Sequence, residues 1–170
     1  MHSVIVSMIF MVATIALPIS GSAAAFLQDM QGEFHDLQEF TGNDKWLVVM
    51  LWASDCHVCN QEAHQYEAFH KAHKDKDARM LGVSADGWAG REDAQQFIKR
   101  HKVTFPNLIG SPESVAGIFS GLTGADWRGT PTFLIFNPKG ELVAQQVGAV
   151  PVKLIEDFMV RETQAAATGS

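Results

Sequence analysis

In KWLVVMLWASDCHVCNQE, Lys45 to Glu62, an apolar run leads directly into two cysteines. Residues 45–54 are rich in branched and aromatic side chains and show no alternation, which is typical of a strand buried on both faces in the middle of a sheet. Residues 57–74 then carry apolar side chains at steps of three and four, which predicts a helix. Cys56 therefore lies where a central strand ends and a helix begins.

Further strands and helices follow in alternation. The predicted elements are a strand at 78–86, a helix at 91–101, a short extended piece in FPNLIG, a short helix capped by Ser111 with Pro112 in first position, strands at 132–136 and 141–147, and a helix from Pro151. Strand and helix in alternation call for parallel pairing through right-handed crossovers. The NPKG turn between the last two strands is too short for a crossover, so those strands form an antiparallel hairpin.

The composition is that of one ordinary folded domain. The chain has 170 residues, which is enough for one hydrophobic core and too few for two comfortable domains. It is 46% hydrophobic and 19% charged, with a formal net charge of −6. Because it has no long run of Lys or Arg, we predict no nucleic-acid partner.

The N-terminal segment has the outline of a secretory signal peptide. Residues 3–28 include no charged side chain, and the apolar run Val4 to Ile19 precedes the small residues of SGSAAAF. Lys and Arg are absent before the apolar run, so an uncleaved membrane anchor is a second interpretation. Both predict an exported protein, most simply periplasmic, either soluble or anchored in the inner membrane. The predicted organisation is a signal peptide or anchor at 1–25, one domain at 26–162 and a disordered tail at 163–170.

The cysteine pair indicates redox exchange more than structural stapling. A disulfide stabilises most when it closes a long loop, and here only two residues separate the cysteines. The amino end of a helix stabilises an anion, which favours the thiolate of Cys56 over the thiol. Cys59, one turn along, points toward the core. Cys56 can therefore attack a disulfide in a partner protein, and Cys59 can then attack Cys56 and release that partner as a dithiol.

Several motifs together resemble the thioredoxin superfamily, and within it the exported TlpA/ResA-like thiol:disulfide oxidoreductases. They are the order of elements, the WAS-x-Cys-x-x-Cys junction, the segment Gly129-Thr130-Pro131-Thr132-Phe133 and the NPKGELV hairpin. The resemblance covers residues 34–159. It implies an α/β fold, a thioredoxin-like three-layer sandwich whose central mixed sheet carries helices on both faces, built from a βαβ unit followed by a ββα unit.

The resemblance also implies roles for particular residues. Cys56 and Cys59 would form the redox-active disulfide, and Pro131 would be cis and face the sulfurs, where it has no N–H to compete for the thiolate. The backbone of Thr130 would pair with an extended substrate chain. A proline that simply starts an edge strand is the alternative for Pro131.

Glu62 lies three residues after Cys59 and matches an acid that this branch carries near the pair. A partly buried carboxylate there would have a raised pKa and could take a proton from Cys59. A solvated helix glutamate is an equal alternative. The acid that thioredoxins bury in the strand six residues before the first cysteine is replaced here by Met50.

The sequence departs from the thioredoxin pattern beside Cys56, where Asp55 stands in place of the usual Trp. A carboxylate opposes thiolate formation, whereas a protonated His57 would favour it. We expect the variable pair His57 and Val58 to contact substrate and to influence the redox potential. Trp127 is either a replacement for the missing apolar platform or a packed loop aromatic.

The resemblance implies protein partners rather than a cofactor. The expected substrates are disulfide-containing or dithiol proteins, and a membrane or periplasmic thiol reductase would reset the pair. The branch mostly reduces its substrates, often in cytochrome c maturation. We predict neither a cofactor nor a bound metal.

Two other functions use the same residues. Cys56, His57 and Cys59, with His64 on the same helical face as His57, could bind and deliver Cu(I). Oxidation outside the cytosol would remove those thiolate ligands, and two cysteines are too few for a structural zinc site. A non-catalytic thioredoxin-like adaptor is the other alternative, although the retained cysteines argue against it.

Overall fold

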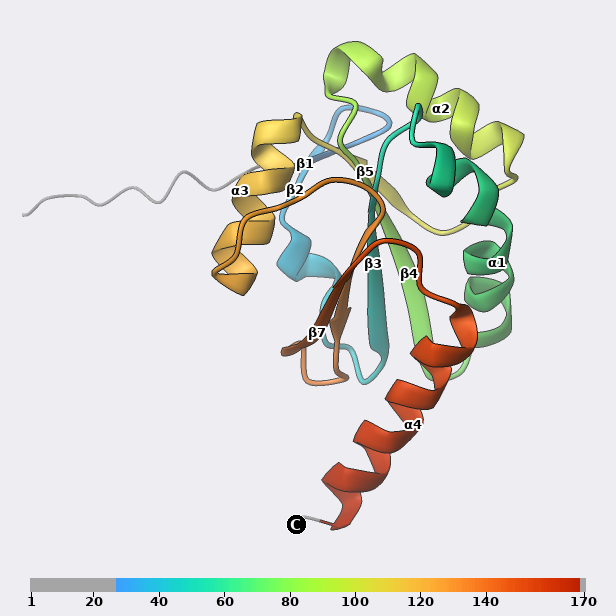
Figure 1. The fold of residues 1–170 in the computed structure, drawn as a ribbon, viewed down its shortest axis with the longest axis vertical. Helices are drawn as coiled ribbons and strands as arrows, with labels where there is room; N and C mark the ends of the chain where they lie inside the picture. Colours follow the sequence, from blue (N-terminus) through green and yellow to red (C-terminus); the bar gives the residue numbers. More distant parts are fainter. Residues whose placement is uncertain (1–26, 169–170) are drawn as a thin grey trace, which may run out of the picture.

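Helices cover both faces of one mixed sheet in the computed structural model, which describes residues 27–168 (Figure 1). The signal peptide or anchor expected at 1–25 lies outside the described residues. The strands are β1 Leu27–Asp29, β2 Phe34–His35, β3 Trp46–Trp52, β4 Ala78–Ser84, β5 Asn107–Ile109, β6 Thr132–Phe136 and β7 Leu142–Val147. The α-helices are α1 His57–His73, α2 Arg91–Arg100, α3 Pro112–Thr123 and α4 Val152–Thr168, and the short 3₁₀ helices are η1 Leu37–Phe40 and η2 Trp88–Gly90.

The sheet has seven strands in the order β2-β1-β5-β4-β3-β6-β7. β4 runs parallel to both β3 and β5, and α1 and α2 make the crossovers between them. β6 runs antiparallel to β3 and forms a hairpin with β7. A βαβ unit is thus followed by a ββα unit, which confirms the expected thioredoxin-like fold.

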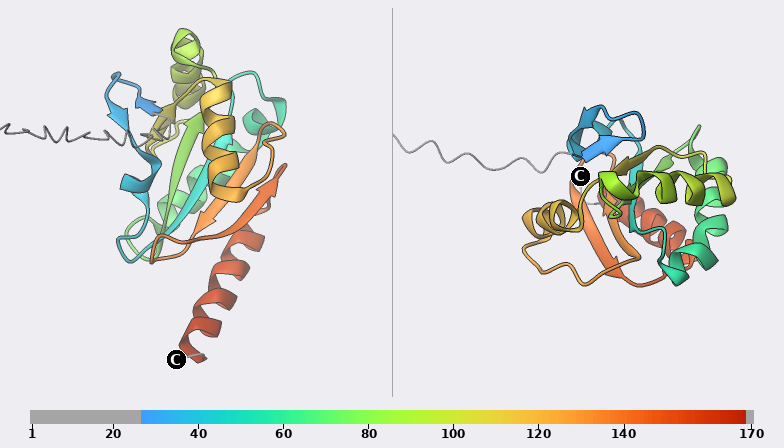
Figure 2. Two further views of the ribbon diagram at one scale, coloured as in Figure 1. Left: turned by 90° about the vertical axis from the view of Figure 1, so that its left-hand side faces the viewer. Right: turned by 90° about the horizontal axis from the view of Figure 1, so that it is seen from above.

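The central strand β3 is buried along its whole length, as its uninterrupted apolar run predicts. Four alternate side chains pack on the face covered by α1, α2 and α4: Trp46, Val48, Met50 and Trp52. The other three pack on the face covered by α3: Leu47, Val49 and Leu51. Figure 2 shows α3 on the opposite side of the sheet from α1 and α4. Because side chains of β3 are packed on both faces of the sheet, the turn that follows its carboxyl end starts from a well-packed strand.

The last helix corrects the disorder expected at 163–170 as far as Thr168, and residues 169–170 lie outside the described residues. α4 continues to Thr168, although residues 160–168 are exposed. Thr163 donates its hydroxyl hydrogen to the Met159 carbonyl at 2.8 Å, and Thr168 does the same to Gln164 at 3.1 Å. The end of the helix is rich in alanine, the residue with the highest helix propensity. Local propensity therefore supports the last turns of this helix, which projects from the body of the domain (Figures 1 and 2).

The β1–β2 hairpin at the edge of the sheet is an addition that the sequence pattern did not reveal. β1 has three residues and β2 has two, which is too short for any visible alternation. β1 pairs antiparallel with β5 and so extends the sheet by one hairpin. Across residues 27–168, no helix combines the length and apolar character needed to cross a membrane.

Candidate active site

Cys56 and Cys59 form a disulfide at the junction of β3 and α1, and their Cα atoms are 5.2 Å apart. Cys56 is the N-cap of α1, and its Sγ accepts a hydrogen bond from the backbone N–H of Cys59 at 3.1 Å. Cys59 is fully buried among the core side chains under α1, whereas Cys56 is half-buried. The two sulfurs thus differ in access, with only Cys56 open to an incoming partner.

The position of Cys56 has a direct chemical consequence. The first amide groups of a helix have no intrahelical acceptor and carry the positive end of the helix dipole. A sulfur at the N-cap is therefore stabilised as a thiolate once the disulfide is reduced. The neighbouring side chains of Asp55 and His57 are both exposed, so water screens their charges.

Pro131 lies at the same end of the sheet as the cysteines. Thr132 of β6 is paired with Leu51 of β3, so the residue before β6 lies beside the carboxyl end of β3. The Thr130–Pro131 peptide bond is cis, as the resemblance implies. Pro131 is buried, and its carbonyl accepts a hydrogen bond from Gly148 N–H at 2.8 Å. The register thus brings together two segments that lie far apart in the sequence.

The other residues expected at the site have different surroundings. Val58 is exposed to 37% beside the cysteines, which suits contact with a partner. Glu62 is half-buried, and its carboxylate accepts a hydrogen bond from the Gln65 amide. Trp127 is half-buried and packs against the core on the α3 face, which favours the packed-aromatic interpretation. Thr130 is half-buried next to Pro131.

Comparison with known proteins assigns this arrangement to a family. A family model described as the AhpC/TSA family matches residues 21–145. The chain belongs to the AhpC/TSA family.

Named relatives of this AhpC/TSA protein are thiol-disulfide oxidoreductases. Thiol-disulfide oxidoreductase ResA of Halalkalibacterium halodurans is 26% identical over 133 residues, which make up 78% of this chain and 70% of that protein. Sporulation thiol-disulfide oxidoreductase A of Bacillus subtilis is 23% identical over 112 residues, 65% of this chain and 64% of that protein. Both relatives are thiol-disulfide oxidoreductases, which is the class of enzyme that the cysteine pair predicts. The resemblance to ResA-like proteins is therefore confirmed.

A solved structure supports the fold. The thioredoxin domain of a thiol-disulfide oxidoreductase from Bacteroides vulgatus superposes with a TM-score of 0.64 at 24% identity, and the match covers 79% of this chain and 91% of that chain. This likeness bears on the fold alone, and it agrees with the thioredoxin-like sandwich described above.

Two polar side chains that sequence reasoning missed hold the turn before Cys56. Asp86, just after β4, accepts hydrogen bonds from the Ser54 N–H at 3.0 Å and from the Ser54 hydroxyl at 2.7 Å. Asn60, directly after Cys59, donates to the carbonyls of Ser54 and Cys56. A signal for Asp86 was present, because the carboxyl ends of parallel strands meet at one edge of a sheet. For Asn60 the sequence offered no such signal.

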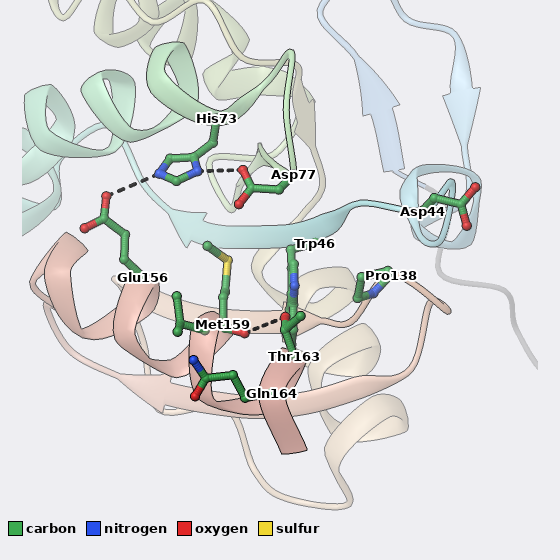
Figure 3. Close-up of a pocket in the computed structure, with 10 residues that line it drawn as sticks. Asp44, Trp46, His73, Asp77, Pro138, Glu156, Met159, Thr163 and Gln164 are labelled. Carbon is green, nitrogen blue, oxygen red and sulfur yellow. Dashed lines mark hydrogen bonds and ion pairs between the residues drawn. The ribbon is translucent and has the colours of Figure 1, made fainter. Parts of the chain in front are cut away.

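A pocket of about 510 Å³ lies at the opposite end of β3 (Figure 3). Trp46, the first residue of β3, lines it together with side chains of α4. On its wall, His73 is hydrogen-bonded to Asp77 at 2.8 Å and to Glu156 at 3.2 Å. A seven-residue strand spans about 20 Å, so this pocket is separate from the cysteines.

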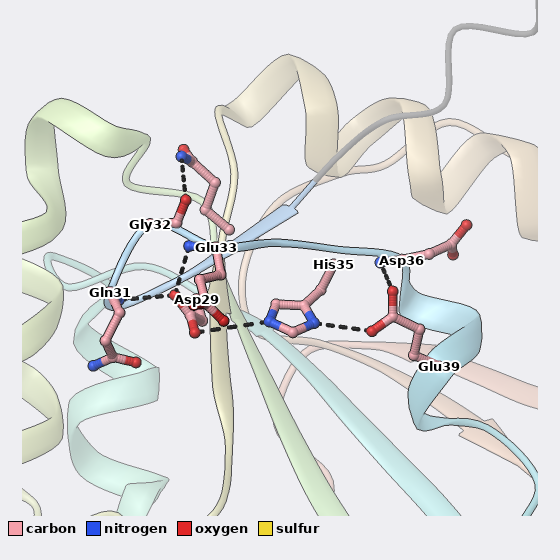
Figure 4. A network of polar contacts seen from close by, with 8 residues as sticks. Asp29, Gln31, Gly32, Glu33, His35, Asp36 and Glu39 are labelled. Atoms are coloured by element: carbon pink, nitrogen blue, oxygen red, sulfur yellow. Dashed lines mark hydrogen bonds and ion pairs between the residues drawn. The ribbon is translucent and has the colours of Figure 1, made fainter.

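One group of potential metal ligands is found among residues 27–168, and it contains neither cysteine. Asp29, Glu33 and His35 approach one another at the β1–β2 hairpin (Figure 4). The hydrogen bond to Glu39 raises the pKa of His35, and the charge of Asp29 adds to this effect. The polar contacts at this hairpin are therefore accounted for by an ion-pair network at the edge of the sheet.

Proposed function

We propose that this protein is an exported thiol:disulfide oxidoreductase that exchanges its Cys56–Cys59 pair with disulfides or dithiols of other proteins. The observation that carries the proposal is the unequal access of the two sulfurs. A half-buried sulfur at the amino end of α1 is disulfide-bonded to a fully buried one a turn further on. The names of the two relatives, both thiol-disulfide oxidoreductases, support the same activity.

The proposed exchange proceeds in two steps. The Cys56 thiolate attacks one sulfur of a substrate disulfide, so an S–S bond forms to Cys56 and the other substrate sulfur leaves as a thiolate. The Cys59 thiolate then attacks the Cys56 sulfur, closes the internal disulfide and releases the second substrate thiolate. Two electrons pass from the pair to the substrate, and the released thiolates take up protons from water or from nearby acids.

Nearby residues would assist these steps. Glu62, half-buried one turn beyond Cys59, would accept the proton that Cys59 loses on becoming a nucleophile. Thr130 and Pro131, at the same end of the sheet, would bind the substrate backbone next to Cys56. The exposed side chains of His57 and Val58 would contact the substrate first.

The proposed direction is reduction of the substrate, with apocytochrome c as a candidate and a membrane or periplasmic thiol reductase as the partner that resets the pair. This direction comes from the resemblance to TlpA/ResA-like proteins. Export rests on the apolar run Val4 to Ile19, and N-terminal sequencing of the mature protein tests it.

An insulin-reduction assay with dithiothreitol as the electron source tests the activity. The wild type should accelerate insulin precipitation, and Cys56→Ser should abolish that acceleration. Cys59→Ser should instead accumulate mixed disulfides that separate on a non-reducing gel. Full turnover by Cys59→Ser would contradict the two-step exchange. Tight Cu(I) binding without insulin reduction would favour metal delivery. A protein that neither binds Cu(I) nor reduces insulin would favour the adaptor.

A further inference from the structure

We propose that Asn60 is a positioning residue whose side chain holds the turn carrying Cys56 and thereby sets the redox potential of the Cys56–Cys59 pair. This inference rests on the function proposed above and adds a residue to it.

The amide group of Asn60 is bonded to the turn through both of its hydrogens. Its Nδ2 donates to the Ser54 carbonyl at 3.0 Å and to the Cys56 carbonyl at 2.9 Å. The Cys56 carbonyl also accepts the backbone N–H of Asn60 at 3.0 Å. One side chain thus bridges the carbonyls on either side of Asp55, and its donor capacity is filled.

The oxygen of the same amide faces α2. The Asn60 Oδ1 accepts from His101 Nε2 at 2.9 Å and lies 3.4 Å from a donor nitrogen of Arg100. Because the carbonyls of Ser54 and Cys56 can only accept, the NH₂ group must point toward them. The amide orientation is therefore determined by its surroundings, and His101 carries its hydrogen on Nε2.

The turn is also held from the other side. Asp86 accepts from the N–H and the hydroxyl of Ser54, while Asn60 donates to the Ser54 carbonyl. The N–H, the carbonyl and the hydroxyl of Ser54 are thus all bonded to side chains. Of the two anchoring residues, Asn60 is the one that also bonds Cys56.

This anchoring matters more in the reduced state than in the oxidised state. In the disulfide form, a covalent bond ties Cys56 to Cys59. After reduction, the place of the Cys56 sulfur beside the Cys59 N–H and the amino end of α1 depends on the conformation of the turn, which the Asn60 side chain helps to hold. Loss of the Asn60 bonds would weaken thiolate stabilisation in the reduced protein, and a less stable reduced form means a more negative potential.

The test is a glutathione redox titration of Asn60→Ala, together with the pH profile of iodoacetamide alkylation of Cys56. We expect the equilibrium constant to shift about tenfold toward the disulfide, which is a potential about 30 mV more negative. The midpoint of the alkylation profile should move to higher pH. Gln61→Ala, an exposed neighbour on the same helix, should leave both readouts unchanged.

His101 provides an independent pair of variants. His101→Ala removes a hydrogen-bond donor to the Asn60 amide oxygen and should shift both readouts in the same direction by a smaller factor. His101→Gln can still donate a hydrogen bond and should restore them. If circular dichroism shows that Asn60→Ala does not fold, the two His101 variants test the role of Asn60 in its place.

If folded Asn60→Ala has a glutathione equilibrium constant within twofold of the wild-type value, the inference is overturned. Equal effects of His101→Ala and His101→Gln on the two readouts would overturn it as well. The proposed function is judged separately by insulin reduction with the wild type. If the wild type does not reduce insulin but its cysteine pair still titrates with glutathione, only the proposed function is overturned. If the wild type reduces insulin but Asn60→Ala has the wild-type potential and alkylation profile, only the role of Asn60 is overturned.

Discussion

Replacing Glu67 with glutamine tests whether one buried carboxylate fastens the segment between α2 and β5 to α1. Glu67 is 5% exposed and accepts hydrogen bonds from Thr104 N–H at 2.8 Å and from the Thr104 hydroxyl at 2.7 Å. Lys71, one turn along α1, contributes a third contact at 3.0 Å. Burial opposes ionisation of the carboxyl, but the donors outweigh burial and hold the pKa of Glu67 below its usual value.

The expected loss follows from these contacts. Hydrogen bonds to a charged group contribute about 1.5–3 kcal/mol each, and bonds between neutral groups contribute about 0.5–1.5 kcal/mol. Glutamine keeps one acceptor oxygen and turns an NH₂ group toward the donors of Thr104. We therefore expect Glu67→Gln to lower the free energy of unfolding by about 2–4 kcal/mol at pH 7. The midpoint of thermal unfolding should fall by roughly 2–4 °C for each kcal/mol.

Urea unfolding at several pH values is the assay. Because the pKa of Glu67 is lower in the folded state, its stabilisation is complete above the ordinary carboxyl pKa of about 4.3 and is lost as the pH falls through the folded value. The difference between wild type and Glu67→Gln should therefore narrow in acid. Glu162→Gln, exposed on α4, should match the wild type throughout. A difference below about 0.5 kcal/mol at pH 7, the size of an ordinary surface substitution, would contradict this role of Glu67. A difference that does not change with pH would refute it as well.

Two further substitutions test packing in the core, and a third tests the exposed end of α4. Tyr66→Phe removes the hydroxyl that donates to the Val150 carbonyl at 3.1 Å, and chemical denaturation should show a loss of about 1–2 kcal/mol. Gly82→Ala places a methyl group against the side chain of Asn107, and overpacking should cost about 1–3 kcal/mol in the same measurement. Ala165→Pro should reduce helicity measured by circular dichroism without changing the unfolding midpoint, since the end of α4 is exposed; a lower midpoint would mean that this end supports the domain.

The part of the site that sequence reasoning located correctly depends on neighbours in the chain. The N-cap position of Cys56 follows from an apolar run that stops and a helical pattern that starts, and the structure has α1 beginning at His57. The burial of Cys59 follows from its place on the inner face of that helix. Periodicity of three to four residues carries this information, so a single sequence suffices.

The remaining part depends on which segments meet in space. Asp86 bonds Ser54 across 32 positions, and Glu67 bonds Thr104 across 37. Polar residues in loops and on helices are usually solvated, so the local pattern does not mark Glu67 and Thr104 as partners. The strand order places Asp86 and Ser54 at one edge of the sheet, but it does not show that they bond to each other. The helical end of α4 was not expected because its residues are polar or small and lie at a chain terminus, where disorder is common.

The position of the reactive cysteine could be read from local sequence, because residues within a few positions of one another set the strand, the cap and the helix. Tertiary structure decided which distant side chains reach that turn, because Asp86 follows β4 and His101 follows α2. Parallel pairing of β3 with β4 delivers Asp86 to the turn, and the packing of α2 beside α1 delivers His101 to Asn60. Residue spacing encodes which side chain faces inward, but the partner that it meets there depends on the assembled sheet.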